Sequence, residues 1–144
     1  MAERPYITIV SGLPRSGTSL MMQMIHAGGI AAVTDEIREP DTDNPRGYYE
    51  FEKVKQIKSD KSWLPGAVGH VVKMVHLLLL DLPADYQYRV VFMRRRLEEV
   101  LKSQSVMLER QGKKGAALPP ATLMKMYQDQ IDKVLKWMSE RSNF

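Results

Sequence analysis

Short continuous hydrophobic runs alternate with helically spaced hydrophobic positions along this chain. The runs at 6–10 (YITIV), 70–75 (HVVKMV) and 89–93 (RVVFM) are short and rich in β-branched residues, so they predict buried strands. Hydrophobic residues then recur at helical spacing, most clearly in 20–25 and in 97–110. This order predicts an α/β fold, in which helices flank a parallel β-sheet and a ligand binds at the carboxyl edge of the sheet.

Polar segments that contain glycine or proline separate the remaining predicted elements. The stretch 34–47 is polar and contains proline, which indicates a surface loop, and a helix is expected to begin near Tyr49 and to bury Val54 and Ile57. After a Gly- and Pro-containing break at 112–120, a last helix carries regularly spaced hydrophobic residues.

That last helix is followed at once by RSNF, and few hydrophobic segments remain in the sequence to cover its apolar face. Either the helix packs on another subunit, which would make the chain a homo-oligomer, or a strand that should follow it is missing. We therefore expect a fold that is shortened at the C-terminus.

Size and composition narrow the function classes. A chain of 144 residues predicts a single domain, 1–144, and the absence of cysteine excludes disulfides and thiol catalysis. The longest apolar run, 71–80, contains Lys73 and His76 and is too short to span a bilayer, and the N-terminus lacks a signal-peptide layout. We expect a cytoplasmic protein without a membrane partner. The net charge of +4 favours an anionic small ligand over nucleic acid.

The stretch GLPRSGTS, residues 12–19, joins the first predicted strand to the first predicted helix. Gly12 and Gly17 are spaced as in a nucleotide-binding P-loop, where backbone N–H groups and the helix N-terminus hold phosphate. Thr18 stands where such a loop carries lysine, the cation is Arg15 instead, and no predicted strand ends in the aspartate that would hold Mg²⁺. The pattern indicates an anion site without a metal. A tight turn without a ligand would not need this cluster of polar residues.

This stretch, extended to GLPRSGTSLM, closely resembles the 5′-phosphosulfate loop of the sulfotransferases, especially the tyrosylprotein and related bacterial branches. Those enzymes transfer a sulfuryl group from 3′-phosphoadenosine 5′-phosphosulfate (PAPS) to a hydroxyl acceptor, on a P-loop-like α/β fold and without a metal. The resemblance implies the same fold topology, donor and reaction here. It also implies that the donor's 5′ end is held by Leu13, Pro14, Arg15, Ser16, Gly17, Thr18 and Ser19.

A second anion site is predicted by Arg95 and Ser103, which stand eight residues apart. They resemble the 3′-phosphate site of the same family, which has an arginine at a strand end and a serine in the next helix, although Leu97 stands where the family often has proline. An arginine can bind phosphate through two nitrogens while a serine donates its hydroxyl hydrogen. Taken alone, the arginines at 94–96 would be a surface run paired with Glu98 and Glu99.

The acceptor's proton requires a base, and three residues are candidates. Glu36 lies twenty-one residues after Arg15, the separation found in tyrosylprotein sulfotransferases. The resemblance makes Glu36 the base and Arg38 an active-site cation, whereas the alternative is a glutamate in solvent. Glu50 is a second candidate.

His76 is the third candidate, because cytosolic sulfotransferases carry a Lys-x-His at a strand end. Here the histidine follows Lys73 by three residues, and on a continuous strand that spacing sends the two side chains to opposite faces, whereas a turn after Met74 would bring them back together. The alternative for a lone histidine in this hydrophobic stretch is a packed residue without a catalytic role. Lys73 itself resembles a family lysine that neutralises the departing phosphate, although a strand-end lysine can also simply reach solvent.

Two other functions remain open. A P-loop nucleotide kinase or other NTPase fits the predicted fold but not the loop, which lacks its lysine. A non-catalytic module that binds a nucleotide fits the expected shortening. The acceptor is not identified by the sequence.

Overall fold

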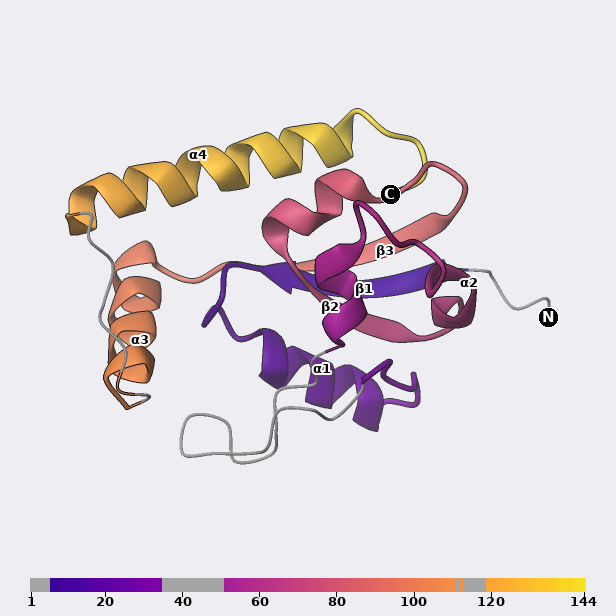
Figure 1. The fold of residues 1–144 in the computed structure, drawn as a ribbon, viewed down its shortest axis with the longest axis horizontal. Helices are drawn as coiled ribbons and strands as arrows, with labels where there is room; N and C mark the ends of the chain where they lie inside the picture. Colours follow the sequence, from indigo (N-terminus) through magenta and orange to yellow (C-terminus); the bar gives the residue numbers. More distant parts are fainter. Residues whose placement is uncertain (1–5, 35–50, 111, 113–118) are drawn as a thin grey trace.

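A computed structural model describes residues 6–34, 51–110, 112 and 119–144 (Figure 1). Three parallel strands form its sheet: β1 (Tyr6–Gly12), β2 (Val71–Val75) and β3 (Gln87–Met93). Their order is β2-β1-β3, and Ser11 of β1 lies opposite Met74 of β2 and Phe92 of β3. The central strand therefore ends between its two neighbours. The predicted α/β class with a parallel sheet is confirmed.

Helices cover both faces of this sheet (Figure 1). The described helices are α1 (Thr18–Ala27), η1 (Glu52–Gln56), α2 (Leu64–Ala67), η2 (His76–Asp81), α3 (Leu97–Arg110) and α4 (Pro120–Ser139), where η denotes a 3₁₀ helix, and α3 lies beyond the ends of the strands. α1 lies on one side, and η2 and α4 lie on the other. Such double coverage explains why the strands are continuous hydrophobic runs and do not alternate with polar residues.

Between α1 and the sheet lies a small core in which Val10, Val71 and Met22 are fully buried. The helical spacing at 20–25 was predicted correctly, but the orientation differs from a simple hydrophobic stripe, since Leu20 and Met24 are 61% and 58% exposed. α1 begins directly at the loop after β1, and this start turns Ser19 and Met22, three residues apart, toward the sheet. Leu20 and Met24 therefore face away from it.

The opposite side holds the main core, which includes Ile7 and Ile9 of β1. Tyr49 lies outside the described residues, and the helix expected near it is described from Glu52 as the short helix η1. Val54 and Ile57 are buried in this core, as predicted.

The apolar face of α4 packs on its own chain at Ile131 and Val134, so the expectation that few partners remain for it is wrong. Val134 is fully buried in the main core, and Ile131 packs with Leu13 and Val100. The chain then returns to β3, where the Tyr88 N–H donates to the Asn143 carbonyl oxygen at 2.8 Å. A homo-oligomer stays a prediction.

Tyr88, at the start of β3, gives the fold an expected alkaline limit. Its side chain is buried, its hydroxyl donates to the Pro83 carbonyl oxygen at 2.7 Å, and burial raises its pKa, with smaller contributions from Tyr86 and Asp85. The folded chain thus holds the phenol proton more tightly than the unfolded chain. This contribution to stability is complete below about pH 10 and is lost as the pH rises through the raised pKa.

We expect the free energy of unfolding, measured by urea titration, to fall less steeply above pH 10 in Tyr88→Phe than in the wild type. Tyr86→Phe, which alters a neighbouring and less buried phenol, should change the slope much less, because burial of Tyr88, the main cause of its raised pKa, remains. Identical slopes in the wild type and Tyr88→Phe would contradict this account.

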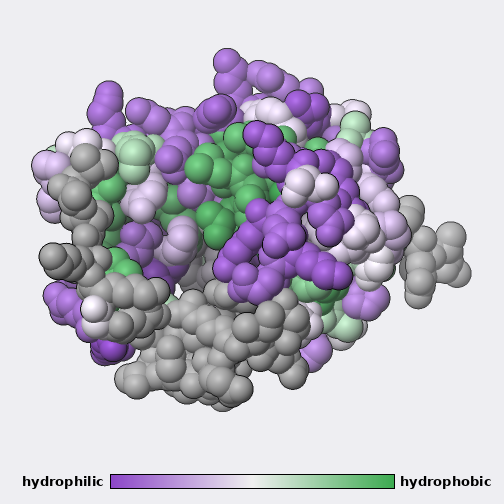
Figure 2. Space-filling model, viewed as in Figure 1, coloured by the Kyte–Doolittle hydropathy of each residue, from purple (hydrophilic) through white to green (hydrophobic). Residues whose placement is uncertain are grey.

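The surface of the described part is mostly polar but carries some large hydrophobic side chains. None of the described helices is both long and apolar enough to cross a membrane. The exposed large hydrophobic residues are Leu20, Met24, Ile30, Val75 and Leu77. On the face drawn in Figure 2, hydrophobic residues reach the surface near the middle and hydrophilic residues border them.

Candidate functional site

The turn between β1 and α1 has the backbone that its two glycines predict. Gly12 has φ 145° and Gly17 has φ 99°, conformations that favour glycine. A Cβ atom on Gly12 would lie 2.7 Å from the Met93 carbonyl oxygen and 2.7 Å from Ser16 Oγ. Arg15 also adopts a positive φ, 69°, which is unfavourable for a residue with a side chain. The turn is therefore tightly wound, and its conformation must be held by its surroundings.

The carbonyl oxygens of this turn are occupied by donors, two of them from the region of α3. The Leu13 oxygen accepts from the Ser16 N–H at 3.2 Å and from the Ser16 hydroxyl. The Pro14 oxygen accepts from Gln104 Nε2, and the Arg15 oxygen accepts from Arg95 Nη1, each at 3.0 Å. In a trans peptide the N–H of the next residue points in the direction opposite to the carbonyl oxygen. The N–H groups that follow Pro14 and Arg15 consequently turn away from α3.

The N-terminus of α1 completes this turn. Gly17 is its N-cap residue, and within the described residues no side chain caps the helix. The first-turn N–H groups of a helix have no intrahelical acceptor, and together they carry partial positive charge. A helix start of this kind binds anions when a loop presents further N–H groups beside it.

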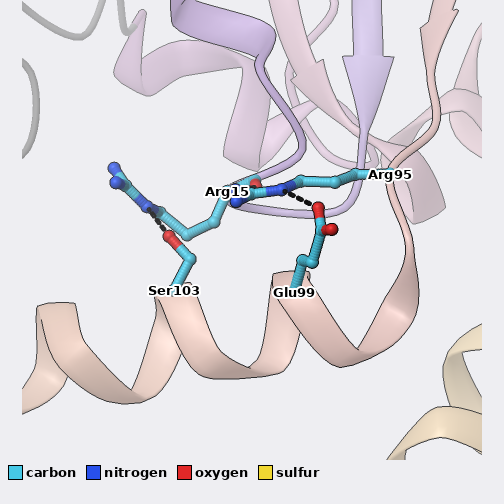
Figure 3. A network of polar contacts seen from close by, with 4 residues as sticks. All are labelled: Arg15, Arg95, Glu99 and Ser103. Carbon is cyan, nitrogen blue, oxygen red and sulfur yellow. Dashed lines mark hydrogen bonds and ion pairs between the residues drawn. The ribbon is translucent and has the colours of Figure 1, made fainter.

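Arg15 connects the turn to the second predicted anion site (Figure 3). Its Nε donates to Ser103 Oγ at 2.9 Å, although the two residues are 88 positions apart. Arg95 lies beside them, with Nε 3.2 Å from Glu99 Oε2. Three of the predicted site residues, Arg15, Arg95 and Ser103, are thus brought together by the fold.

A hollow of about 420 Å³ opens along α3 next to this cluster. It is lined by Arg15, Arg95, Glu99, Lys102, Ser103, Val106 and Arg110. Four of these residues are cationic and Glu99 alone is acidic, so the hollow is electropositive. The sequence prediction missed Lys102, Val106 and Arg110. Their spacing from Ser103 and Glu99, close to multiples of a helical turn, is the signal that could have placed them on the same face.

The lysine and the histidine predicted for the site are separated by the sheet. Lys73 lies on the α1 side, where its Nζ donates to Ser19 Oγ at 3.3 Å. His76 is buried on the α4 side, where its Nε2 lies 2.7 Å from Gln130 Oε1. Its Nδ1 is also buried and has no hydrogen-bond partner within the described part of the chain. The two other predicted bases, Glu36 and Glu50, lie outside the described residues, as does Arg38.

The remaining loop residues contribute in different ways. Leu13 is buried against Val100 and Ile131, so it anchors the turn to the helices α3 and α4. The Ser16 hydroxyl is engaged inside the turn, and Pro14 is exposed. Thr18 is half-buried at the first position of α1.

Comparison with known proteins adds no assignment: no family model, no curated protein and no solved structure matches the chain. In the ranges that the structure describes, no three histidine, aspartate or glutamate side chains form a group that could hold a metal ion. Binding without a metal stays a prediction.

Proposed function

We propose that this chain binds PAPS and transfers its sulfuryl group to a hydroxyl acceptor, on a sheet that is a short form of the P-loop-like sulfotransferase topology. The observation that carries the proposal is the Arg15–Ser103 hydrogen bond. It joins a glycine-containing turn at a helix N-terminus to Ser103 of α3, and Arg95, just before that helix, lies beside them. Both parts suit anionic groups, and a nucleotide with phosphates at its 5′ and 3′ positions carries two such groups at a fixed separation.

In this proposal the 5′-phosphosulfate lies in the turn. The loop N–H groups, the N-terminus of α1 and the hydroxyls of Thr18 and Ser19 are its donors. Lys73 reaches the same place, since its Nζ lies 3.3 Å from Ser19 Oγ. A sulfuryl group carries less charge than a phosphoryl group, so fixed donors and a lysine can take the role that Mg²⁺ has in phosphoryl transfer.

The 3′-phosphate is proposed to enter the hollow beside α3. Arg95 retains guanidinium N–H groups beyond those that contact Arg15 and Glu99, and these can donate to phosphate oxygens. Ser103 and Arg15 then bind the same phosphate as well as each other.

The transfer itself forms one bond and breaks another. The acceptor oxygen attacks sulfur, the bond from sulfur to the bridging oxygen breaks, and adenosine 3′,5′-bisphosphate leaves with the electron pair while Lys73 neutralises its new charge. Glu36 is proposed to accept the acceptor's proton. His76 is a weaker candidate, because it is buried beneath α4 on the opposite face from Lys73.

The test is calorimetric titration with adenosine 3′,5′-bisphosphate, with EDTA and again with Mg²⁺, followed by an assay for transfer of labelled sulfate from PAPS to simple phenols and alcohols. We expect saturable binding of equal affinity in both buffers. No binding in either buffer would contradict the proposal. Magnesium-dependent binding of ATP would support an NTPase instead, and bisphosphate binding without transfer to any acceptor would support a non-catalytic module.

A further inference from the structure

Two polar residues that the proposed reaction does not use form a hydrogen-bonded chain from α4 to the anion-binding turn. The Tyr127 hydroxyl donates to Gln104 Oε1 at 3.3 Å, and Gln104 Nε2 donates to the Pro14 carbonyl oxygen at 3.0 Å. Because a carbonyl oxygen is an acceptor alone, the amide nitrogen of Gln104 must face Pro14. The amide oxygen then faces Tyr127, so each contact fixes the other.

The last hydrogen bond of this series is accepted by Pro14, the residue that precedes Arg15 in the turn. Proline has a fixed φ and no N–H, so its carbonyl oxygen is its one backbone hydrogen-bonding group. A neighbour that binds this oxygen orients the peptide between Pro14 and Arg15. That peptide leads into Arg15, whose positive φ is costly for an arginine. Gln104 holds the peptide before Arg15, and Arg95 holds the peptide after it. A strained residue persists where its surroundings determine it in this way.

Tyr127 in turn is placed by packing. Its ring lies against a third hydrophobic cluster, which contains Leu13, Val100 and Ile131. Leu13 belongs to the turn itself, so the same cluster anchors both ends of the chain of contacts. α4 thereby acts on the turn through α3, although it contributes no side chain to the hollow.

We propose that Gln104 and Tyr127 are positioning residues, which orient the peptide between Pro14 and Arg15 so that the Arg15 N–H meets a 5′-phosphate. The part of this inference that concerns the nucleotide rests on the proposed function. The part that concerns the conformation of the turn stands on the contacts alone, so the two parts are tested separately.

The first experiment compares two nucleotides in Gln104→Leu, Tyr127→Phe and the wild type by calorimetry. Gln104→Leu removes the donor to Pro14 with little change in size, and Tyr127→Phe removes one hydroxyl and keeps the ring. We expect affinity for adenosine 3′,5′-bisphosphate to fall roughly 3- to 10-fold in Gln104→Leu and less in Tyr127→Phe, the range for loss of one hydrogen bond. Affinity for adenosine 3′-monophosphate, which lacks the 5′ group, should stay unchanged.

The matched control is Gln128→Leu, which alters the residue next to Tyr127 and removes a contact with Asp132 within α4. It should bind both nucleotides like the wild type. An equal loss for both nucleotides in Gln104→Leu would indicate general damage to α3 and overturn the positioning role, and unchanged affinities in Gln104→Leu would overturn it as well.

The second experiment needs no ligand. Amide hydrogen exchange at residues 15–18, followed by NMR, should be faster in Gln104→Leu and Tyr127→Phe than in the wild type or Gln128→Leu. If the wild type binds neither nucleotide, the proposed function fails, and this measurement alone decides the inference. Exchange rates that do not differ between Gln104→Leu and the wild type would overturn it.

Discussion

Replacing Arg95 with alanine is expected to lower affinity for adenosine 3′,5′-bisphosphate by roughly 10- to 100-fold, the range for hydrogen bonds to a charged group. The guanidinium has two roles at once. It lines the cationic hollow, and its Nη1 holds the Arg15 carbonyl oxygen at 3.0 Å. Its removal therefore takes a charge from the phosphate and releases one side of the turn. Calorimetric titration measures the loss directly.

Arg94→Ala is the matched control, because Arg94 is exposed, is not among the residues that line the hollow, and carries the same charge. We expect it to bind nearly as the wild type does. Arg95→Lys should recover part of the affinity, since lysine keeps the charge but cannot donate through a planar fork. Equal affinity in Arg94→Ala and Arg95→Ala would remove Arg95 from the site.

Replacement of Glu99 is expected to change the affinity for the nucleotide in the opposite direction. Its carboxylate lines the hollow and faces Arg95 Nε at 3.2 Å, so it competes with an incoming phosphate for the guanidinium. Glu99→Gln should therefore raise affinity by roughly two- to fivefold, the scale of an exposed ion pair.

The elements of the fold were predictable because each rests on local pattern. Continuous β-branched runs identified the strands, and the spacing of Gly12 and Gly17 identified the turn before its backbone was known. The strands and the turn depend on neighbours in sequence, which a sequence displays. The separation of Lys73 from His76 was only partly predictable. The three-residue spacing sends side chains to opposite faces on a continuous strand, but β2 ends at Val75 and His76 begins η2, and the structure places the two side chains on opposite sides of the sheet.

The assembly of the site was less predictable, because it depends on packing between distant segments. The spacing of Arg95 and Ser103 indicated a shared anion site, but their contacts with Arg15 come from the packing of Leu13 against Val100. Gln104 was missed for a related reason: a polar residue on a helix does not reveal its partner in the sequence. The partners of α4 were missed because Ile131 and Val134 pack on segments that precede them by many residues.

Gly12→Ala is expected to have the largest effect on stability, lowering the free energy of unfolding by about 2–5 kcal/mol through backbone strain and steric overlap together. The φ of 145° disfavours any side chain, and the new Cβ would meet the Met93 carbonyl oxygen at 2.7 Å. That oxygen belongs to the end of β3, so it cannot move aside as a flexible side chain would. Urea titration followed by tryptophan fluorescence, to which Trp63 in the main core and the half-buried Trp137 both contribute, reports the change.

Alanine substitutions at three glycines separate the cost of backbone strain from the cost of steric overlap. Gly17 has φ 99° but the nearest heavy atom to a new Cβ is Met93 Cε at 3.5 Å, so Gly17→Ala should cost about 1–2 kcal/mol from strain alone. Gly66 lies within α2 with open space around it, so Gly66→Ala should be neutral or slightly stabilising. Equal stability losses in Gly12→Ala and Gly17→Ala would show that the close approach of β3 to the turn contributes nothing. In that case the packing between the first strand's end and β3, on which the position of Arg95 beside Arg15 depends, would need another explanation.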